Sequence, residues 1–194
     1  FKSEFSQIFE SFRGDVLLFS YSLVGFDSKA DMMFWRIGDS LDLIQEMTAK
    51  LYRTELGSFL ETADNYLAVT KKMVFVQDST EDRFHVNAGE KKYHFIYPCS
   101  KQKEWYDMSN EEREALIEEN FMVGKKFQNI KIHMTHAFGF SDQYLISFET
   151  DEPKDFLALA EELREMPASK YTLRGMPVYT CRQRPLMDCL DALG

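Results

Sequence analysis

Hydrophobic and polar residues alternate in short blocks along the first part of the chain. Residues 16–24 are apolar and aromatic with interleaved serines, and the turn-forming residues 25–28 follow, which predicts a strand that ends in a turn. A second strand is predicted over residues 31–37. Ser40 can then cap a helix that runs to about residue 54, because apolar side chains recur along it at spacings of three and four, at Leu41, Ile44, Met47 and Leu51.

The same order of elements appears again later in the chain. Residues 131–138 are typical of a strand, residues 139–142 of a turn and residues 143–149 of a second strand, and a helix is predicted to begin at Pro153. The two turns have similar sequences, Val-Gly-Phe-Asp-Ser and Phe-Gly-Phe-Ser-Asp, and the helices begin 15 and 14 residues after the glycine. This similarity indicates an internal repeat, and coincidence between two short segments is the alternative.

A repeat of this kind predicts an α+β fold with two similar halves, residues 1–88 and 89–194. Each half would form a four-stranded antiparallel sheet with helices on one face, and the two sheets could pack face to face or join as a barrel. Residues 78–90 are rich in charged and small polar side chains, which is typical of a linker or a surface loop.

The segment after this linker is predicted to hold a strand and a long helix. The strand covers residues 92–97 and is expected to stop at Pro98. Ser109 and Glu112 form a capping-box pattern that opens the helix, and Gly124 is expected to end it.

Composition excludes several classes of function. The chain has 32 acidic residues against 23 Lys and Arg, and its net charge of -9 repels a nucleic-acid backbone, so we expect no nucleic-acid partner. No apolar run approaches the roughly 20 residues that span a membrane, so we expect no membrane insertion. Three scattered cysteines favour a reducing, cytoplasmic location, and the start at Phe1 leaves open an N-terminal leader.

Asn120 is predicted to point inward from the helix that follows Ser109. Leu116 and Asn120 are four residues apart, so they share one face of that helix. An asparagine near a helix end can also bond its own backbone, here near Gly124, and this structural role is the alternative to a place in a functional site.

Nine short segments from about residue 93 to residue 180 resemble the chlorite dismutase superfamily in order and spacing. That superfamily includes the coproheme decarboxylases of haem synthesis. The resemblance implies two ferredoxin-like halves that form a barrel with helices outside, and a ring-shaped homo-oligomer, commonly a pentamer. The segments are Tyr97-Pro98-Cys99-Ser100-Lys101, Trp105-Tyr106, Glu112-Arg113, Gly124-Lys125-Lys126-Phe127, Phe138-Gly139-Phe140-Ser141-Asp142, Phe148-Glu149-Thr150-Asp151, Leu163-Arg164, Ser169-Lys170-Tyr171 and Pro177-Val178-Tyr179-Thr180.

The family's haem-using members bind iron through a histidine on the helix after the Trp-Tyr segment. In this sequence that position, 15 residues after Trp105, holds Asn120. An amide is a poor ligand for haem iron compared with imidazole, so the sequence predicts no metal ligand of the usual kind, with Asn120 in the ligand's place.

The opposite side of the implied pocket also differs from members that split chlorite, which place an arginine on the next strand. There is no arginine between Arg113 and Arg164, so we expect no chlorite dismutation. The strand carries His133 and His136, which cannot both face one pocket because side chains alternate along a strand. His133 lies nearest the expected position, and His85 is similar to a distal histidine of some decarboxylases.

Two residues match the decarboxylase branch of the family. Tyr97 and Lys101 occupy the places of a tyrosine that forms a radical and a lysine that holds a propionate, and Trp105 is expected to pack near the ring. The resemblance therefore implies a haem- or coproheme-binding oxidoreductase of the decarboxylase-like kind, with a porphyrin ligand. The alternative is a haem-free family member that acts as a structural or small-molecule-binding oligomer.

Overall fold

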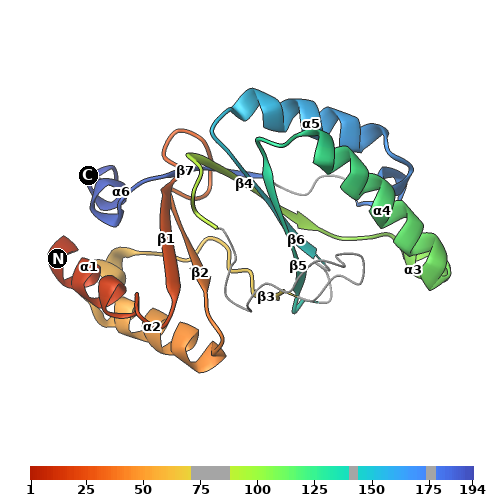
Figure 1. The fold of residues 1–194 in the computed structure, drawn as a ribbon. Coiled ribbons are helices and arrows are strands. Elements are labelled where there is room, and N and C mark those ends of the chain that lie inside the picture. The colour runs from red at the N-terminus through yellow and green to blue at the C-terminus, as the bar shows by residue number, and fades with distance from the viewer. Residues whose placement is uncertain (71–87, 140–143, 174–177) are drawn as a thin grey trace. The chain divides into compact units, whose positions relative to one another are not determined.

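A computed structural model describes residues 1–70, 88–139, 144–173 and 178–194 (Figure 1). Most of the expected linker over residues 78–90, His85, and most of the expected turn over residues 139–142 lie outside these described ranges. Within them the protein is an α+β structure with antiparallel strand pairs, as predicted.

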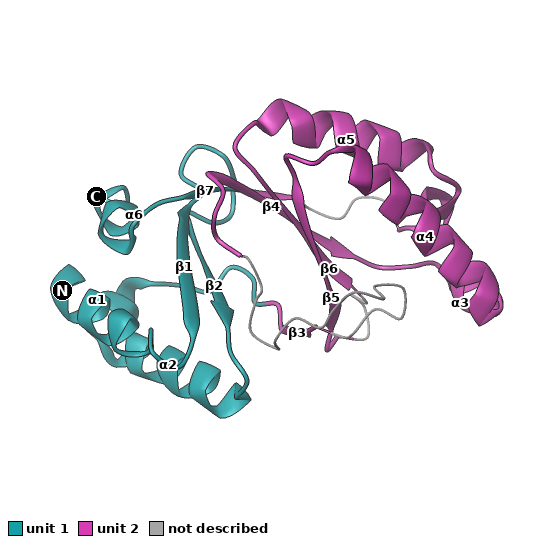
Figure 2. Cartoon of the chain, in the orientation of Figure 1, with its two compact units in different colours: residues 1–65, 181–194 teal, residues 66–180 magenta. Residues whose placement is uncertain are grey.

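The chain divides into two compact units, residues 1–65 with 181–194, and residues 66–180 (Figure 2). These limits differ from the halves expected at residues 1–88 and 89–194. The physical reason is that the C-terminal helix packs into the core of the first unit, where Leu186 and Leu190 are buried together with Phe5 and Phe9.

The first unit packs helices against a pair of antiparallel strands. Its strands pair from Leu17 opposite Ile37 to Ser22 opposite Met32. The predicted helix cap at Ser40 is confirmed, because its side chain accepts a hydrogen bond from the backbone N–H of Leu43. In chain order the unit contains α1 (Lys2–Ser11), β1 (Leu17–Ser22), β2 (Met32–Ile37), α2 (Leu41–Arg53), the short 3-10 helix η1 (Leu56–Phe59) and α6 (Leu186–Asp191).

The second unit has an antiparallel sheet in the order β4-β6-β5-β3, with α4 and α5 on one face (Figure 1). Apolar side chains of both helices and of the sheet form its core, in which the rings of Phe95 and Phe156 stack 3.9 Å apart. The unit contains β3 (Ala68–Val69), β4 (Tyr93–Cys99), α3 (Lys103–Asp107), α4 (Asn110–Lys126), β5 (Lys131–Ala137), β6 (Tyr144–Thr150), α5 (Pro153–Glu165) and the 3-10 helix η2 (Pro167–Tyr171); β7 (Tyr179–Gln183) runs from this unit into the first.

Two predicted ends of elements were wrong. β4 continues through Pro98 to Cys99, and a proline so close to the end of a strand removes only one donor from the ladder. α4 continues past Gly124 to Lys126. Gly124 serves close packing instead, because a Cβ atom there would lie 2.8 Å from Cδ1 of Ile132 on β5.

The start of α4 is as predicted. The Ser109 side chain accepts from the backbone N–H of Glu112, and the Glu112 carboxylate accepts from the backbone N–H of Ser109. This reciprocal capping box determines where the helix begins and therefore which residues it presents to the sheet. None of the described helices is long and apolar enough to cross a membrane.

Candidate functional site

The strand register of the second unit separates its polar residues onto two faces. Tyr97, Tyr144 and His136 lie on the face that packs against α4 and α5, because their neighbours in register Phe95, Phe148 and Ile146 belong to the core beneath those helices. His94, His133 and Glu149 alternate with these residues and therefore lie on the other face of the sheet.

A cavity of about 450 Å³ lies between α4 and the helix-covered face of the sheet. Four of its residues come from α4 at helical spacing, which places them along one stripe of the helix. Trp105 comes from α3, His136 from β5 and Tyr144 from β6. The cavity is lined by Trp105, Asn110, Arg113, Glu114, Ile117, His136 and Tyr144.

Trp105 packs against Lys101, a half-buried residue that does not itself line the cavity. The Trp105 side chain is only 1% exposed, and the Lys101 Nζ atom lies 4.5 Å from the centroid of its ring. The same ammonium donates a hydrogen bond to Thr172 Oγ1 at 2.8 Å and to the Ala168 carbonyl oxygen at 3.5 Å. Burial lowers the pKa of Lys101, and these contacts hold the cation beside the indole.

Two phenols lie on the same face of the sheet. Burial raises the pKa of Tyr144, although a hydrogen bond with Trp105 acts in the opposite direction. Burial also raises the pKa of Tyr97, which packs against the apolar core of the unit and does not line the cavity. Both side chains are therefore held as neutral phenols at neutral pH.

Asn120 continues the stripe of α4 that lines the cavity, three residues after Ile117. Its Oδ1 atom is buried and has no hydrogen-bond partner among the residues that the structure describes. For this oxygen atom, the predicted alternative of a bond to the helix backbone near Gly124 is not seen. A buried acceptor without a protein partner is costly to the fold.

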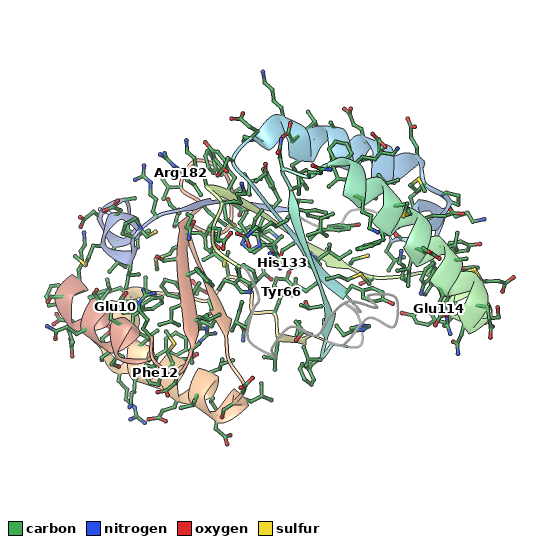
Figure 3. The ribbon with its side chains drawn as sticks, in the orientation of Figure 1. Glu10, Phe12, Tyr66, Glu114, His133 and Arg182 are labelled. Atoms are coloured by element: carbon green, nitrogen blue, oxygen red, sulfur yellow. The ribbon has the colours of Figure 1, made fainter. Side chains whose placement is uncertain are left out.

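His133 does not join the other predicted site residues. It lies on the other face of the sheet, and Figure 3 labels its position. Its Nε2 atom is 2.8 Å from Oε1 of Glu149. Oε2 of Glu149 accepts a hydrogen bond from the backbone N–H of Gly89 at 2.9 Å. The sequence indicated both His133 and His136 on this strand and placed His133 nearest the expected position, whereas His136 is the one that lines the cavity. Tyr144 and Arg113, which also line the cavity, were not predicted as site residues. Strand register, which decides the face of a residue such as Tyr144, is not visible in the sequence.

The residues that the structure describes contain no group of three or more His, Cys, Asp or Glu side chains that could hold a metal ion.

The chain belongs to the chlorite dismutase family, whose sequence pattern matches residues 1–184. It is 25% identical over 175 residues to the coproheme decarboxylase of Mycolicibacterium smegmatis, covering 87% of this chain and 73% of that protein. It is also 24% identical over 180 residues to the coproheme decarboxylase of Staphylococcus carnosus, covering 84% and 71% of the two chains. The resemblance inferred from the sequence is confirmed.

Solved structures of chlorite dismutase from Candidatus Nitrospira defluvii have the same fold. A variant in complex with cyanide superposes with a TM-score of 0.86 at 26% identity and covers 98% of this chain and 83% of its own. The complex with imidazole gives a TM-score of 0.84 at 24% identity, with coverage of 98% and 84%.

Proposed function

We propose that this protein is a haem- or coproheme-binding oxidoreductase, decarboxylase-like rather than chlorite-splitting. The observation that carries the proposal is the half-buried Lys101 ammonium held over Trp105, whose ring lines a cavity between α4 and the sheet. A cation held in this way suits the carboxylates of a propionate-bearing porphyrin. The two relatives that are named coproheme decarboxylase give independent support.

The residues around the cavity fit a carboxylate-bearing porphyrin only in part, because Glu114 adds a carboxylate to its wall and Lys101 lies outside the lining. The volume of about 450 Å³ lies in the range of small-molecule pockets. Arg113 adds a second cation beside the aromatic walls of Trp105 and Tyr144. The usual ligand on the helix does not fit, because Asn120 offers an amide oxygen where iron prefers an imidazole nitrogen.

When bound, the porphyrin iron would supply the oxidising chemistry, and the chain's own residues would bind and position the substrate. Lys101 would hold a propionate, and Trp105 would exclude water from it. Tyr97 is kept protonated because burial raises its pKa, so it can release a proton together with an electron. Strand β5 carries no arginine, and Arg113 reaches the cavity from α4 instead, which argues against chlorite chemistry.

The proposal extends to fold and assembly. We infer that the order β1-β2-α2 and its counterpart β5-β6-α5 are the remains of two tandem ferredoxin-like halves of a barrel. A homopentamer in the cytoplasm stays a prediction from the sequence, and mass measurement in solution tests the oligomer.

Titration with porphyrins tests binding. Ferric coproporphyrin and haemin should each produce a Soret change that saturates at one porphyrin per chain. Lys101→Met should weaken coproporphyrin binding by roughly tenfold, because a carboxylate loses its partner. Lys103→Met is the matched control, since Lys103 is exposed and pairs with Asp107. If no porphyrin gives a saturable change, the haem-free binding protein becomes the better explanation.

Turnover is a separate test. Ferric coproporphyrin bound to the protein should lose carbon dioxide when hydrogen peroxide is added, and mass spectrometry of the porphyrin detects the loss. Tyr97→Phe should keep the porphyrin affinity and remove the product, because only the phenolic proton and electron are lost. Equal product from this variant would exclude the role of Tyr97.

A further inference from the structure

We propose that the outward face of α4 binds the same face of a second copy of this chain, with the two helices antiparallel about a two-fold axis at Met122. The surface lies outside the cavity, so the contact does not depend on porphyrin binding. It also differs from the contacts of the expected ring. A ring is built from two different surfaces that meet head to tail, whereas this contact joins one surface to itself.

One side of α4 covers the sheet of the second unit (Figure 1), and the opposite side is an exposed stripe. The residues of the stripe recur at spacings of three and four, which places them on one face of the helix. An apolar side chain stands at its centre, since Met122 is 55% exposed. The stripe consists of Ala115, Glu118, Glu119, Met122, Lys125 and Lys126, all of them exposed.

The stripe borders an open groove of about 890 Å³ that is lined by apolar residues as well as by its charges. The buried Val123 and the half-buried Met166, which follows α5, belong to this lining together with Ala115 and Met122. A methionine side chain is unbranched and adapts to irregular apolar gaps. Met122 of a second copy therefore suits the groove, and by symmetry each copy fills the groove of the other.

The charges of the stripe complement those of a second copy. Glu118 and Glu119 lie four and three residues before Met122, and Lys125 and Lys126 lie three and four residues after it. When two such helices run antiparallel about Met122, Glu118 lies opposite the partner's Lys126, and Glu119 lies opposite the partner's Lys125. A parallel alignment would place like charges opposite each other. Charge complementarity therefore selects a second copy of this chain in the antiparallel orientation.

The contacts that the two lysines make within the chain are exposed and leave room for a partner. Lys126 Nζ is 2.7 Å from Oε2 of Glu162, with side chains that are 62% and 42% exposed. Lys125 Nζ lies 4.8 Å from the centroid of the Phe121 ring. Exposed ion pairs contribute little to stability, and an ammonium has three donors, so each lysine can turn to a carboxylate of the partner.

The first experiment needs no variant. A single pair of helices buries less surface than a standard protein interface, so we expect a dissociation constant in the micromolar range. Sedimentation velocity should show a mass that rises reversibly with protein concentration through this range. The rise should weaken at high salt, because salt screens exposed charges. A mass that stays constant through the micromolar range at both low and high salt would overturn the proposal.

A pair of charge variants then tests the orientation. Lys125→Glu with Lys126→Glu makes the stripe acidic throughout, and Glu118→Lys with Glu119→Lys makes it basic. Each double variant alone should associate with itself at least roughly tenfold more weakly than the unmodified protein. An equimolar mixture of the two should associate again, because every charge then faces its opposite, and misfolding cannot produce this recovery. A mixture that stays dissociated, or variants that associate alone like the unmodified protein, would refute the proposal.

Lys29→Glu with Arg53→Glu is the matched control. It changes the net charge by the same amount as the acidic variant, at exposed positions of the first unit. Its association should equal that of the unmodified protein. An equal loss of association in this control would attribute the effect to net charge and contradict the contact through α4.

Cross-linking locates the two-fold axis. The three native cysteines are buried, so a new exposed thiol is the reactive one. Met122→Cys should form a covalent dimer with a short bismaleimide, because a residue on the axis meets its own copy. Glu111→Cys lies 11 residues before Met122 on the same helix, so its two copies would be far apart and should not be linked. Cross-linking of Glu111→Cys but not of Met122→Cys would exclude the axis at Met122. Porphyrin titration of these variants is a separate measurement, and its result leaves this contact unaffected.

Discussion

His94 on β4 and Glu149 on β6 lie directly opposite each other, and their side chains are 1% and 0% exposed. Burial lowers the pKa of His94 to about 3; repulsion from His133 acts in the same direction and attraction to Glu149 opposes both. Burial alone would raise the pKa of Glu149, but hydrogen bonds from His133 and Gly89 lower it below its usual value. The sheet therefore holds a carboxylate next to a neutral imidazole.

We expect the protein to lose stability as the pH falls from about 6.5 towards 3. In that window the unfolded chain protonates His94, whose ordinary pKa is 6.5, while the folded protein does not until about pH 3. Urea unfolding at several pH values measures the slope. In His94→Phe the slope between pH 6.5 and 4.5 should flatten, and an unchanged slope would show that another group is responsible.

Glu149→Gln should destabilise the fold by roughly 2 kcal/mol, because bonds to a buried charge are replaced by weaker neutral ones. The pKa of Glu149 is lowered from 4.5, so its contribution is present above that pH and is lost as the pH falls through the folded value. Unfolding at pH 7 and pH 3 should therefore show a smaller difference between the variant and the unmodified protein at pH 3. An equal difference in stability between the two proteins at pH 7 and at pH 3 would argue against an ionised Glu149.

Two glycines should respond in opposite ways to alanine. Gly124→Ala should stabilise α4 by up to about 1 kcal/mol, because alanine favours a helix and the nearest atom is the tip of Ile132, which is 41% exposed and can move. Gly57→Ala should cost about 2 kcal/mol, since the new methyl group would meet the backbone carbonyl of Leu51. Thermal unfolding of the Gly124→Ala and Gly57→Ala variants measures both changes in stability. Equal changes in the two variants would contradict the prediction.

Asn120→Leu should raise stability by about 1 kcal/mol. The substitution removes a buried acceptor that has no hydrogen-bond partner among the described residues and adds apolar surface to the helix face. Asn120→Asp is the contrasting variant and should lower stability at pH 7, because it buries a charge. Urea unfolding measures the stability of both variants. A loss of stability in Asn120→Leu would mean that the Asn120 amide stabilises the folded protein.

The elements that depend on local signals were predictable from the sequence. The helix caps at Ser40 and Ser109 use hydrogen bonds between residues three apart, so the short sequence around each contains the whole interaction. Pro98 and Gly124 misled the prediction because their local preference for ending an element is overridden by tertiary packing. β4 is held by its pairing with β6, and α4 continues past Gly124 to Lys126, with Gly124 packed close to Ile132.

The sequence by itself determined the family and the repeated strand-strand-helix order, because these follow from residue types at fixed spacing. Tertiary structure alone decided which histidine faces the cavity. A shift of one residue in register moves a side chain to the opposite face of a sheet. Pairing with β6 placed His136 beside Tyr144 and His133 beside Glu149, and this pairing joins residues that are distant in the chain.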